Sequence, residues 1–272
     1  MVSQEQRRRQ LAREKFLRQQ QRRTSARRKA RMRNSVIASV LGVVVIGSLA
    51  LYTTGVLKKD DTKENAGAEV TPSATPSKAP DPCEKPAEGK VKTATWKKEP
   101  ELTVDKSAKY TMKLATTCGD IDIALKASAA PHTVNSFDFL AGKGYFDHSK
   151  CHRLTTNGIY VLQCGDPTGT GTGGPGYMIP DENLKDKSLK NNIYPAGTVA
   201  MANTGQKHSG GSQFFLVYQD SQLPPSYTPF GTVSESGMKV LKKIADAGES
   251  TGQGDGAPNA TVVIDKATVT KS

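Results

Sequence analysis

Apolar and polar residues alternate through the second half of the chain, and this alternation predicts a fold made mostly of β-strands. The segment 110–116 alternates, and after a Cys-Gly-Asp turn the segment 121–125 alternates again, as expected for an antiparallel hairpin. Similar runs predict further strands at 151–154, 159–163, 198–201, 213–218, 228–233 and 261–269. Many short strands separated by turn residues favour a closed antiparallel β-barrel.

Two segments instead repeat their apolar residues with the period of a helix. Pro131 stands where the first turn of a helix tolerates proline, and Gly142 and Gly144 end the pattern that it begins. The segment 237–247 repeats in the same way. The apolar faces of these two predicted helices comprise Val134, Phe137, Leu140, Ala141, Val240, Leu241 and Ile244. We therefore expect residues 105–272 to form a barrel capped by two helices.

The first third of the chain contains an uncharged, mostly apolar run at residues 35–57. Its length is about the 20 residues that a helix needs to cross a bilayer. A cleaved signal peptide has its parts in the same order, but the basic region and the apolar run are both longer here than in ordinary signal peptides. The run therefore predicts a transmembrane helix that acts as an uncleaved signal anchor.

Nearly all of the formal net charge of +12 lies before this predicted span. Residues 1–34 contain 13 Lys and Arg against Glu5 and Glu14, a net charge of +11, so +1 remains for residues 35–272. Because 13 basic residues precede the span, while Lys58 and Lys59 after it are balanced by Asp60 and Asp61, the positive-inside rule places the N-terminus in the cytoplasm and the remaining chain outside. A basic tail could also bind RNA, but this one lacks interleaved aromatic residues. We expect no nucleic-acid partner.

All four cysteines lie after the predicted span, where disulfides persist. If the chain folds back between Cys151 and Cys164, the two lie close together on adjacent strands and form the first candidate pair. Cys83 and Cys118 form the second, although Cys83 lies in the segment 58–104, whose Pro-, Ser-, Thr- and Lys-rich composition predicts a disordered linker. No Cys-x-x-Cys is present, so disulfides are favoured over a zinc site and we expect no metal.

Three further motifs suggest chemistry that their surroundings do not support. The run 169–174 satisfies Gly-x-Gly-x-x-Gly, but a proline follows where a nucleotide-binding helix would begin. Asp181 and Glu182 are adjacent, and adjacent residues seldom face one cleft, so we expect solvated loop acids and not a hydrolase pair. The strand period points His152 away from Arg153, which favours a structural hydrogen-bonding role over that of a general base.

Four short motifs lie in order along the predicted domain: Cys-His-Arg at 151–153, Gln-Cys-Gly-Asp at 163–166, Met-Ala-Asn at 201–203 and Gly-Ser-Gln-Phe-Phe at 211–215. Together they closely resemble the cyclophilin family of peptidyl-prolyl cis-trans isomerases, over about residues 105–270. The resemblance implies a β-barrel, in agreement with the alternating pattern, and no cofactor. With the predicted anchor, it implies the membrane-anchored type found in actinobacteria.

The resemblance also implies roles for individual residues. Arg153 takes the catalytic role, and Gln163 holds the arginine and the substrate. The other matched positions bind the substrate: Tyr160, Val161, Ala202, Asn203, Gln213, Phe215, Leu223 and Tyr227.

These residue types suit the rotation of an Xaa-Pro bond. Rotation breaks amide resonance against a barrier of about 18–20 kcal/mol. A catalyst needs no nucleophile for this step, but it must bind the twisted amide better than either planar form. The proline nitrogen becomes more basic on twisting, so a guanidinium near it and an apolar pocket for the ring both help. We expect an isomerase that acts on proline-containing polypeptides and assists the folding of exported proteins.

The sequence departs from common cyclophilins at several positions. The segments between Arg153 and Gln163 and at 205–211 are longer, which predicts a reshaped entrance to the groove. Gln222 stands where many members carry a tryptophan that helps to bind cyclosporin, and Tyr227 replaces a frequent pocket histidine. Strong cyclosporin binding is therefore not expected.

Two other functions remain open from the sequence. The domain could hold proline-containing peptides with little turnover, as a chaperone module, although binding alone would not need Arg153. Alternatively, the tail at 1–34 could be the functional part, with the barrel as an accessory. A peptide isomerisation assay tests the first alternative, and deletion of the tail tests the second.

Overall fold

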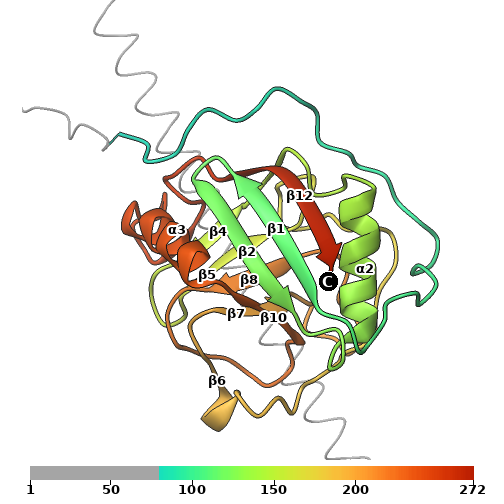
Figure 1. Ribbon diagram of the computed structural model, residues 1–272. Coiled ribbons are helices and arrows are strands. Elements are labelled where there is room, and N and C mark those ends of the chain that lie inside the picture. Colours follow the sequence, from blue (N-terminus) through green and yellow to red (C-terminus); the bar gives the residue numbers. More distant parts are fainter. Residues whose placement is uncertain (1–79) are drawn as a thin grey trace, which may run out of the picture. The chain divides into compact units, whose positions relative to one another are not determined.

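One curled antiparallel sheet surrounds the core of this protein, whose computed structural model describes residues 80–272 (Figure 1). Its strands are β1 (Tyr110–Thr116), β2 (Gly119–Leu125), β3 (Ser149–Lys150), β4 (Arg153–Thr155), β5 (Val161–Cys164), β7 (Thr198–Met201), β8 (Phe214–Val217), β10 (Pro229–Val233), β11 (Asp255–Gly256) and β12 (Val263–Lys271). Their order in the sheet is β11-β4-β5-β8-β7-β10-β2-β1-β12-β3. A separate small ladder pairs β6 (Ile193–Tyr194) with β9 (Ser221–Gln222).

The predicted hairpin of β1 and β2 is confirmed, and its side chains alternate between core and solvent. Tyr110, Met112 and Leu114 of β1 are buried, while the residues between them are exposed. Across the ladder Met112 faces Ile123 and Leu114 faces Ile121, and both isoleucines are buried. This period of two places one face of the hairpin on the core.

The predicted closed barrel is instead a curled sheet that backbone ladders do not close. No ladder in residues 80–272 joins β3, at one end of the strand order, to β11, at the other. The chain itself crosses this gap, because β3 leads into β4 through two residues. Cys151 N–H donates to the Val262 carbonyl beside β12 (3.0 Å), and His152 N–H donates to the Gln163 carbonyl of β5 (3.1 Å). One covalent crossing therefore replaces the missing ladder.

Two α-helices of the described chain pack on the sheet, as predicted, and lie on opposite sides of it in Figure 1. The helix α2 (Pro131–Gly142) lies against β12, and α3 (Glu235–Asp246) lies against β2. The proline at the start of α2 lacks only an N–H that the first turn leaves unpaired. The helix α3 begins earlier than predicted because Ser234 caps it, with its Oγ accepting a hydrogen bond from Gly237 N–H at 3.1 Å.

Glu182 caps the N-terminus of α2 from a distant loop. Its carboxylate accepts hydrogen bonds from His132 N–H at 3.1 Å and from Thr133 N–H at 2.9 Å. These N–H groups have no partner within the helix, and the helix dipole favours a negative charge beside them. The neighbouring Asp181 accepts a hydrogen bond from His208 N–H at 2.9 Å. The prediction of solvated loop acids at these two positions is therefore wrong, since both carboxylates hold the fold together.

Four buried phenylalanines meet between α2 and the sheet. The ring centroid of Phe137, on α2, lies 5.2 Å from that of Phe146, 5.4 Å from that of Phe214 and 4.6 Å from that of Phe230. Stacked, edge-on and tilted ring pairs at such distances add to the energy of apolar burial. Of the residues predicted to face the core from the helices, Val134, Phe137, Leu140, Ala141, Leu241 and Ile244 are buried and Val240 is partly buried.

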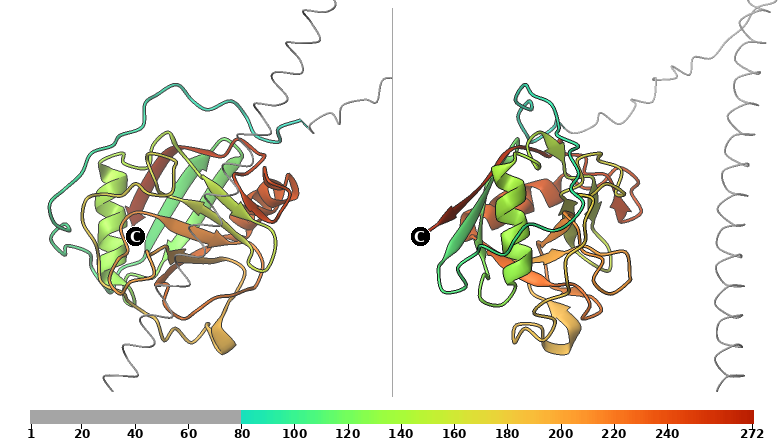
Figure 2. Two further views of the ribbon diagram at one scale, coloured as in Figure 1. Left: turned by 180° about the vertical axis from the view of Figure 1, so that it is seen from behind. Right: turned by 90° about the vertical axis from the view of Figure 1, so that its right-hand side faces the viewer.

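Residues 80–104, called the strap below, contain no helix or strand but follow the surface of the domain to the start of β1 (Figure 2). A disulfide between Cys83 and Cys118 fixes the beginning of the strap. Near its end, Thr103 N–H donates to Asn135 Oδ1 of α2 at 2.9 Å. The prediction of a disordered linker is corrected for these residues, because their backbone is bonded to the domain.

The other predictions for the first third of the chain fall outside the described residues. These are the basic tail at 1–34, the anchor at 35–57 and the beginning of the linker. Within residues 80–272, no helix is both long enough and apolar enough to cross a membrane.

The elements that the sequence did not indicate are very short. The strands β3, β6, β9 and β11 have two residues each, and the 3₁₀ helix η1 (Lys190–Asn192) has three. Such a run contains at most one period of alternation, so its pattern cannot be distinguished from that of a loop.

Candidate active site

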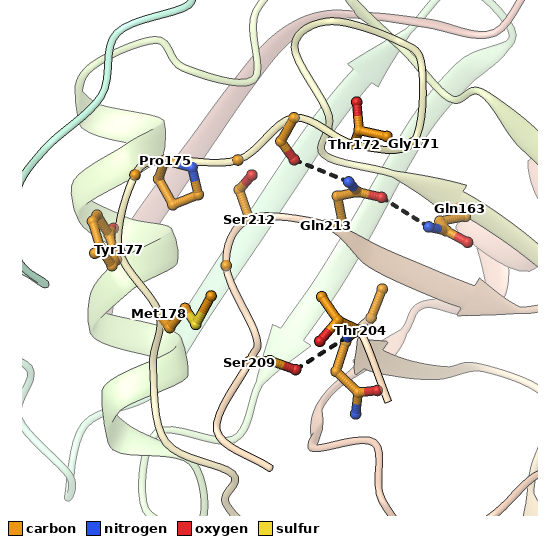
Figure 3. Close-up of a pocket in the computed structure, with 16 residues that line it drawn as sticks. Gln163, Gly171, Thr172, Pro175, Tyr177, Met178, Thr204, Ser209, Ser212 and Gln213 are labelled. Atoms are coloured by element: carbon orange, nitrogen blue, oxygen red, sulfur yellow. Dashed lines mark hydrogen bonds between the residues drawn. The ribbon is translucent and has the colours of Figure 1, made fainter. Parts of the chain in front are cut away.

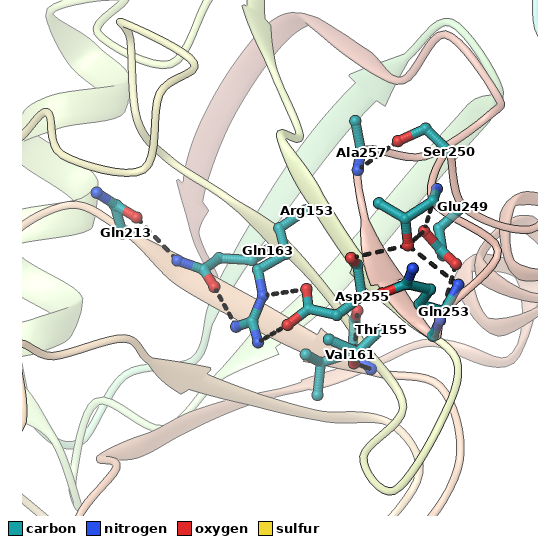
Figure 4. A network of polar contacts seen from close by, with 12 residues as sticks. Arg153, Thr155, Val161, Gln163, Gln213, Glu249, Ser250, Gln253, Asp255 and Ala257 are labelled. Carbon is teal, nitrogen blue, oxygen red and sulfur yellow. Dashed lines mark hydrogen bonds and ion pairs between the residues drawn. The ribbon is translucent and has the colours of Figure 1, made fainter. Parts of the chain in front are cut away.

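Arg153 lies at the start of β4, opposite Gln163 of β5 in the register of the sheet. Its guanidinium makes two parallel hydrogen bonds to Asp255, from Nε to Oδ1 at 2.7 Å and from Nη2 to Oδ2 at 2.8 Å. Its Nη1 donates to Oε1 of Gln163 at 3.2 Å (Figure 4). A bidentate pair of this kind fixes both the position and the plane of the guanidinium.

Two glutamine amides continue the hydrogen bonds away from Arg153 (Figure 3). Gln163 Nε2 donates to Gln213 Oε1 at 2.9 Å, and Gln213 Nε2 donates to the carbonyl of Gly173 at 2.9 Å. A guanidinium can only donate and a backbone carbonyl can only accept, so the direction of the chain is set from both ends. Each glutamine therefore has one permitted orientation, and Gln163 presents its oxygen to Arg153.

Asp255 is held in place by the loop that follows α3. It belongs to β11, where it pairs with Thr155 of β4. The loop before it folds around the carboxylate of Glu249, which accepts hydrogen bonds from Thr251 N–H at 2.6 Å and from Gly254 N–H at 2.8 Å. Glu249 therefore fixes the loop, the loop fixes Asp255, and Asp255 fixes the arginine.

The ion pair shifts the pKa of both partners. The hydrogen bonds from Arg153 lower the pKa of Asp255, and the hydrogen bonds to Asp255 raise the pKa of Arg153. The two side chains are 38% and 55% exposed, and exposed ion pairs add little to the free energy of unfolding. The pair therefore orders the site more than it stabilises the fold.

A pocket of about 180 Å³, called the small pocket, opens beside Arg153. Its lining is Arg153, Ile159, Val161, Gln163, Ala202, Asn203, Phe215, Leu223 and Tyr227. Phe215 is buried, and its ring stands edge-on to that of Tyr227 at 5.4 Å. The hydroxyl of Tyr194 donates to the Tyr227 carbonyl at 2.8 Å, and burial raises the pKa of Tyr194 to about 12, so this bond persists at neutral pH.

Tyr160 does not line this pocket, contrary to the expectation from the sequence. Its ring packs edge-on against that of Tyr218, with centroids 5.9 Å apart. Successive side chains of an extended segment point to opposite faces, and Val161 and Gln163 both line the pocket. Residue 159 shares their face and residue 160 does not, so Ile159 takes the place that was assigned to Tyr160.

A second pocket of about 630 Å³, called the large pocket, adjoins the first (Figure 3). Both pockets include Gln163, Ala202 and Asn203 in their lining. One wall of the large pocket is the segment 171–178. Gln213, which was predicted to bind the substrate, lies in the lining of the large pocket and is bonded to Gln163.

Ala202 and Asn203 follow β7 at the junction of the two pockets. Ala202 N–H donates to the carbonyl of Gln213 at 2.9 Å. The side-chain amide of Asn203 bonds within its surroundings, with Nδ2 donating to the Ser226 carbonyl at 2.8 Å and Oδ1 accepting from Gly205 N–H at 3.0 Å. These bonds hold the junction in one shape.

Both predicted disulfides are present. Cys151–Cys164 links the crossing before β4 to the end of β5, with Cα atoms 4.1 Å apart. It is close in sequence to both Arg153 of β4 and Gln163 of β5, so it limits the movement of the two strands that carry the arginine and its amide partner. Cys83 pairs with Cys118 and ties the strap to the turn between β1 and β2.

His152 does not have the hydrogen-bonding role that was expected of it. Both ring nitrogens are buried, and neither has a hydrogen-bond partner among the described residues. Burial lowers the pKa of His152, so the imidazole is neutral at pH 7. The part of the chain that the structure describes contains no cluster of His, Cys, Asp or Glu arranged to hold a metal ion.

The sequence did not point to Asp255 or Ile159. Asp255 is separated from Arg153 by 102 residues and lies in a glycine-rich loop without a motif, so no local signal marks it. Ile159 was detectable, because it lies on the same side of an extended segment as Val161 and Gln163.

The site offers a fixed hydrogen-bond donor in a pocket that also has apolar side chains in its lining, among them Val161, Phe215 and Leu223. A guanidinium has five N–H groups, and the bonds to Asp255 and Gln163 use three of them. Two N–H groups of Arg153 are then left for a bound molecule, at the rim of a pocket wide enough for a small ring.

Comparison with known proteins agrees with this geometry. Residues 111–269 match the family described as cyclophilin type peptidyl-prolyl cis-trans isomerase/CLD. The chain is 44% identical over 212 residues to the probable peptidyl-prolyl cis-trans isomerase B of Mycobacterium leprae, covering 75% of this chain and 67% of that protein. It is 44% identical over 208 residues to the protein of the same name from Mycobacterium tuberculosis, covering 74% and 63%. The chain thus spans about two thirds of the length of these relatives.

The fold is similar to that of a cyclophilin type peptidyl-prolyl cis-trans isomerase from Cryptosporidium parvum, whose crystal structure was determined in the presence of the dipeptide Ala-Pro. The TM-score is 0.50 at 27% identity, and the match covers 60% of this chain and 99% of that chain. The alignment with the M. leprae protein is longer than the matched range 111–269, and only three residues follow residue 269. The likeness to the mycobacterial relatives therefore extends into the segment before residue 111. The assignment made from the four sequence motifs is confirmed, and the chain belongs to the cyclophilin-type peptidyl-prolyl cis-trans isomerase family.

Proposed function

We propose that this chain catalyses rotation about Xaa-Pro bonds in exported polypeptides, at the outer face of a membrane in which residues 35–57 anchor it. The observation that carries the proposal is the Arg153 guanidinium at the rim of a pocket lined by Phe215, Leu223 and Tyr227. A pocket of this size fits a proline ring, and a guanidinium beside it suits the nitrogen of that ring.

Catalysis follows from the difference between the planar and the twisted amide. As the bond twists, the proline nitrogen loses its conjugation with the carbonyl and becomes a better hydrogen-bond acceptor. The N–H groups of Arg153 that Asp255 and Gln163 do not use donate to it, and this bond is stronger in the twisted state than in either planar state. Because its partners already hold the guanidinium, little reorganisation accompanies the step.

The large pocket receives the residues next to the proline. It shares Gln163, Ala202 and Asn203 with the small pocket, so a peptide whose proline ring fills one pocket passes directly into the other. The presence of Ala-Pro with the C. parvum relative supports proline-containing peptides as the ligands.

The membrane location is supported by the sequence before residue 58 and by the cysteines. Basic residues are far more numerous before the apolar run than after it, and all four cysteines of the chain are in disulfides, as expected in an oxidising compartment. We expect a cytoplasmic N-terminus and an exposed domain. Protease added to intact cells should then digest the domain and spare the tail at 1–34. Protection of the domain would reverse the orientation.

The activity is tested by measuring kcat/KM of the full-length chain on a peptide with one Xaa-Pro bond. A large acceleration over the uncatalysed reaction is expected, together with weak inhibition by cyclosporin because of Gln222 and Tyr227. Tight peptide binding without acceleration would favour the alternative of a chaperone module that holds proline-containing segments.

A further inference from the structure

The large pocket is supported by the strap, which precedes the matched family domain. Trp96 N–H donates to the carbonyl of Pro175 at 2.8 Å. Pro175 belongs to the wall of the large pocket formed by residues 171–178. The family match begins at residue 111, so this contact comes from a segment that the matched domain does not include.

The wall and the strap fit together at the level of the backbone. Gly176, next to Pro175, has a φ of +85°, which side-chain-bearing residues rarely adopt. A Cβ atom at this position would lie 2.8 Å from the Trp96 carbonyl oxygen and 2.9 Å from the Cβ of Thr95. Glycine is therefore required here for two reasons, its conformation and the closeness of the strap.

The indole of Trp96 is also linked to a second segment that lines the large pocket, residues 211–213. Its ring centroid lies 5.2 Å from that of Phe139 on α2 and 5.8 Å from that of Tyr145. The Tyr145 hydroxyl accepts a hydrogen bond from Ser212 Oγ at 3.4 Å, and Ser212 also lines the large pocket. Trp96 therefore contacts the wall through its backbone and is linked to Ser212 through Tyr145.

The strap is fixed on both sides of Trp96. The disulfide Cys83–Cys118 holds it before this residue, and the bond from Thr103 N–H to Asn135 Oδ1 holds it after. With both ends attached, Trp96 is held against the wall and cannot swing away without breaking other contacts.

We infer that Trp96 is a positioning residue for the large pocket, and that through it the strap makes this isomerase prefer extended polypeptides over minimal Xaa-Pro units. Four glycines stand in the wall at 171–178, and glycine-rich backbone has to lose much conformational freedom when a ligand orders it. When the wall is already ordered, binding of a peptide costs less conformational entropy. A peptide that reaches the large pocket gains from this, whereas one that fills only the small pocket does not. The inference rests on the proposed roles of the two pockets.

The test compares two substrates of the full-length chain: a hexapeptide with a central Xaa-Pro bond, and an Ala-Pro unit capped at both ends and followed by NMR exchange. Trp96→Ala is expected to raise KM for the hexapeptide roughly three- to tenfold, the order expected when side chains must be ordered on binding. Its kcat for the hexapeptide, and both constants for capped Ala-Pro, should stay at the wild-type values. Trp96→Phe keeps a ring against Phe139 and Tyr145 and should restore most of the affinity.

Leu102→Ala is the matched control. Leu102 lies on the same strap, its side chain is 43% exposed, and it lines neither pocket, so both substrates should be turned over as by the wild type. Gly176→Ala displaces the same contact from the side of the wall and should reproduce the rise in KM for the hexapeptide alone. If Trp96→Ala unfolds at too low a temperature to be assayed, the KM values of Gly176→Ala test the inference in its place.

Equal changes for both substrates, or no change for either, would overturn the inference. A wild-type chain that accelerates neither substrate would instead refute the proposed activity, so the two failures are distinguishable. Trp96 is the only tryptophan in the chain, which adds a direct readout. Its emission should shift when the hexapeptide binds and stay unchanged with capped Ala-Pro, and the same shift with both would contradict a role confined to the large pocket.

Discussion

The two pockets that meet at Gln163 are built from different kinds of structure. Most of the small pocket is lined by residues on or next to strands, whereas the large pocket is lined by the segments 171–178 and 202–213, almost entirely loop. Strand residues are positioned by the register of the sheet. Loop residues are positioned by contacts from elsewhere, here the bond from Gln213 to Gly173 and the strap. With the proposed roles of the two pockets, the sheet would hold the catalytic arginine and the proline ring, and the loops would recognise the residues next to the proline.

The largest effect that would test this difference between the two pockets is expected in the small pocket, which the strands line, at Arg153. Arg153→Ala should lower kcat by about 10²–10³, by analogy with the loss of one donor to a developing charge. The melting temperature should hardly change, because the side chain is 38% exposed. The measurement is kcat/KM on an Xaa-Pro peptide together with a thermal melt. A folded Arg153→Ala protein with near wild-type kcat/KM would show that this arginine is not catalytic.

The next largest effect is expected at Phe215, which belongs to the sheet and to the small pocket at once. Phe215→Ala should lower kcat/KM by about 10- to 100-fold through a higher KM, because the ring contacts planar and twisted substrate alike. It should also lower the free energy of unfolding by about 3–5 kcal/mol, since the side chain is buried. Phe215→Leu serves as the conservative control. A lower melting temperature with unchanged KM would assign Phe215 to the core alone.

A smaller effect is expected at Asp255, which touches Arg153 but lines neither pocket. Asp255→Asn should lower kcat roughly fivefold at unchanged KM, because an amide cannot accept both guanidinium N–H groups and the exposed pair is worth about 1 kcal/mol at most. Asp255→Glu should recover part of the loss. An increase in kcat would mean that the carboxylate weakens Arg153 by neutralising it, which would contradict a positioning role.

The same ion pair predicts how activity depends on pH. The pKa of Asp255 is lowered from 3.8 by its bonds with Arg153. A carboxyl group with a depressed folded-state pKa contributes fully above its ordinary value and loses its contribution as the pH falls through the lower one. We expect kcat/KM to be flat from about pH 8 to pH 5 and to fall only below about pH 4, and Asp255→Asn should lack that fall. A midpoint near pH 6.5 would point to a histidine instead.

The smallest effect is expected on the loop side, at Met178. This residue is 65% exposed and lines the large pocket. Met178→Ala should raise KM about two- to threefold for peptides that extend into the large pocket and leave capped Ala-Pro unaffected. Equal effects on the two substrates would remove the functional distinction between the two pockets.

Much of the sheet side could be predicted from the sequence, because its signals are local. Alternation over 110–116 and again over 121–125 predicted the hairpin of β1 and β2, and a helical period with Pro131 at its start predicted α2. The Cys-His-Arg motif at 151–153 predicted that Arg153 belongs to the site. The pairing of Cys151 with Cys164 followed from the expected fold-back of a single hairpin.

The loop side and the supports of the site could not be predicted, because they depend on contacts between distant segments. Asp255 reaches Arg153 across 102 residues, and Glu182 caps α2 from 49 residues beyond Thr133. The strap was assigned to a disordered linker on composition, since nothing local in a Pro-, Thr- and Lys-rich segment shows that Trp96 fits beside Gly176. The prediction of a closed barrel was wrong for a similar reason. A two-residue strand such as β3, at one end of the sheet, leaves no alternating pattern in the sequence from which its pairing could be predicted.

The disulfide between Cys83 and Cys118 has a mechanical consequence. It is a covalent shortcut from the beginning of the strap to the turn between β1 and β2. Tension that arrives along the chain from residues before Cys83 passes through the disulfide into the hairpin of β1 and β2, and does not need to pass through Trp96. The part of the strap that contacts the large pocket is then mechanically shielded, so a pull on the chain need not deform the wall that it supports.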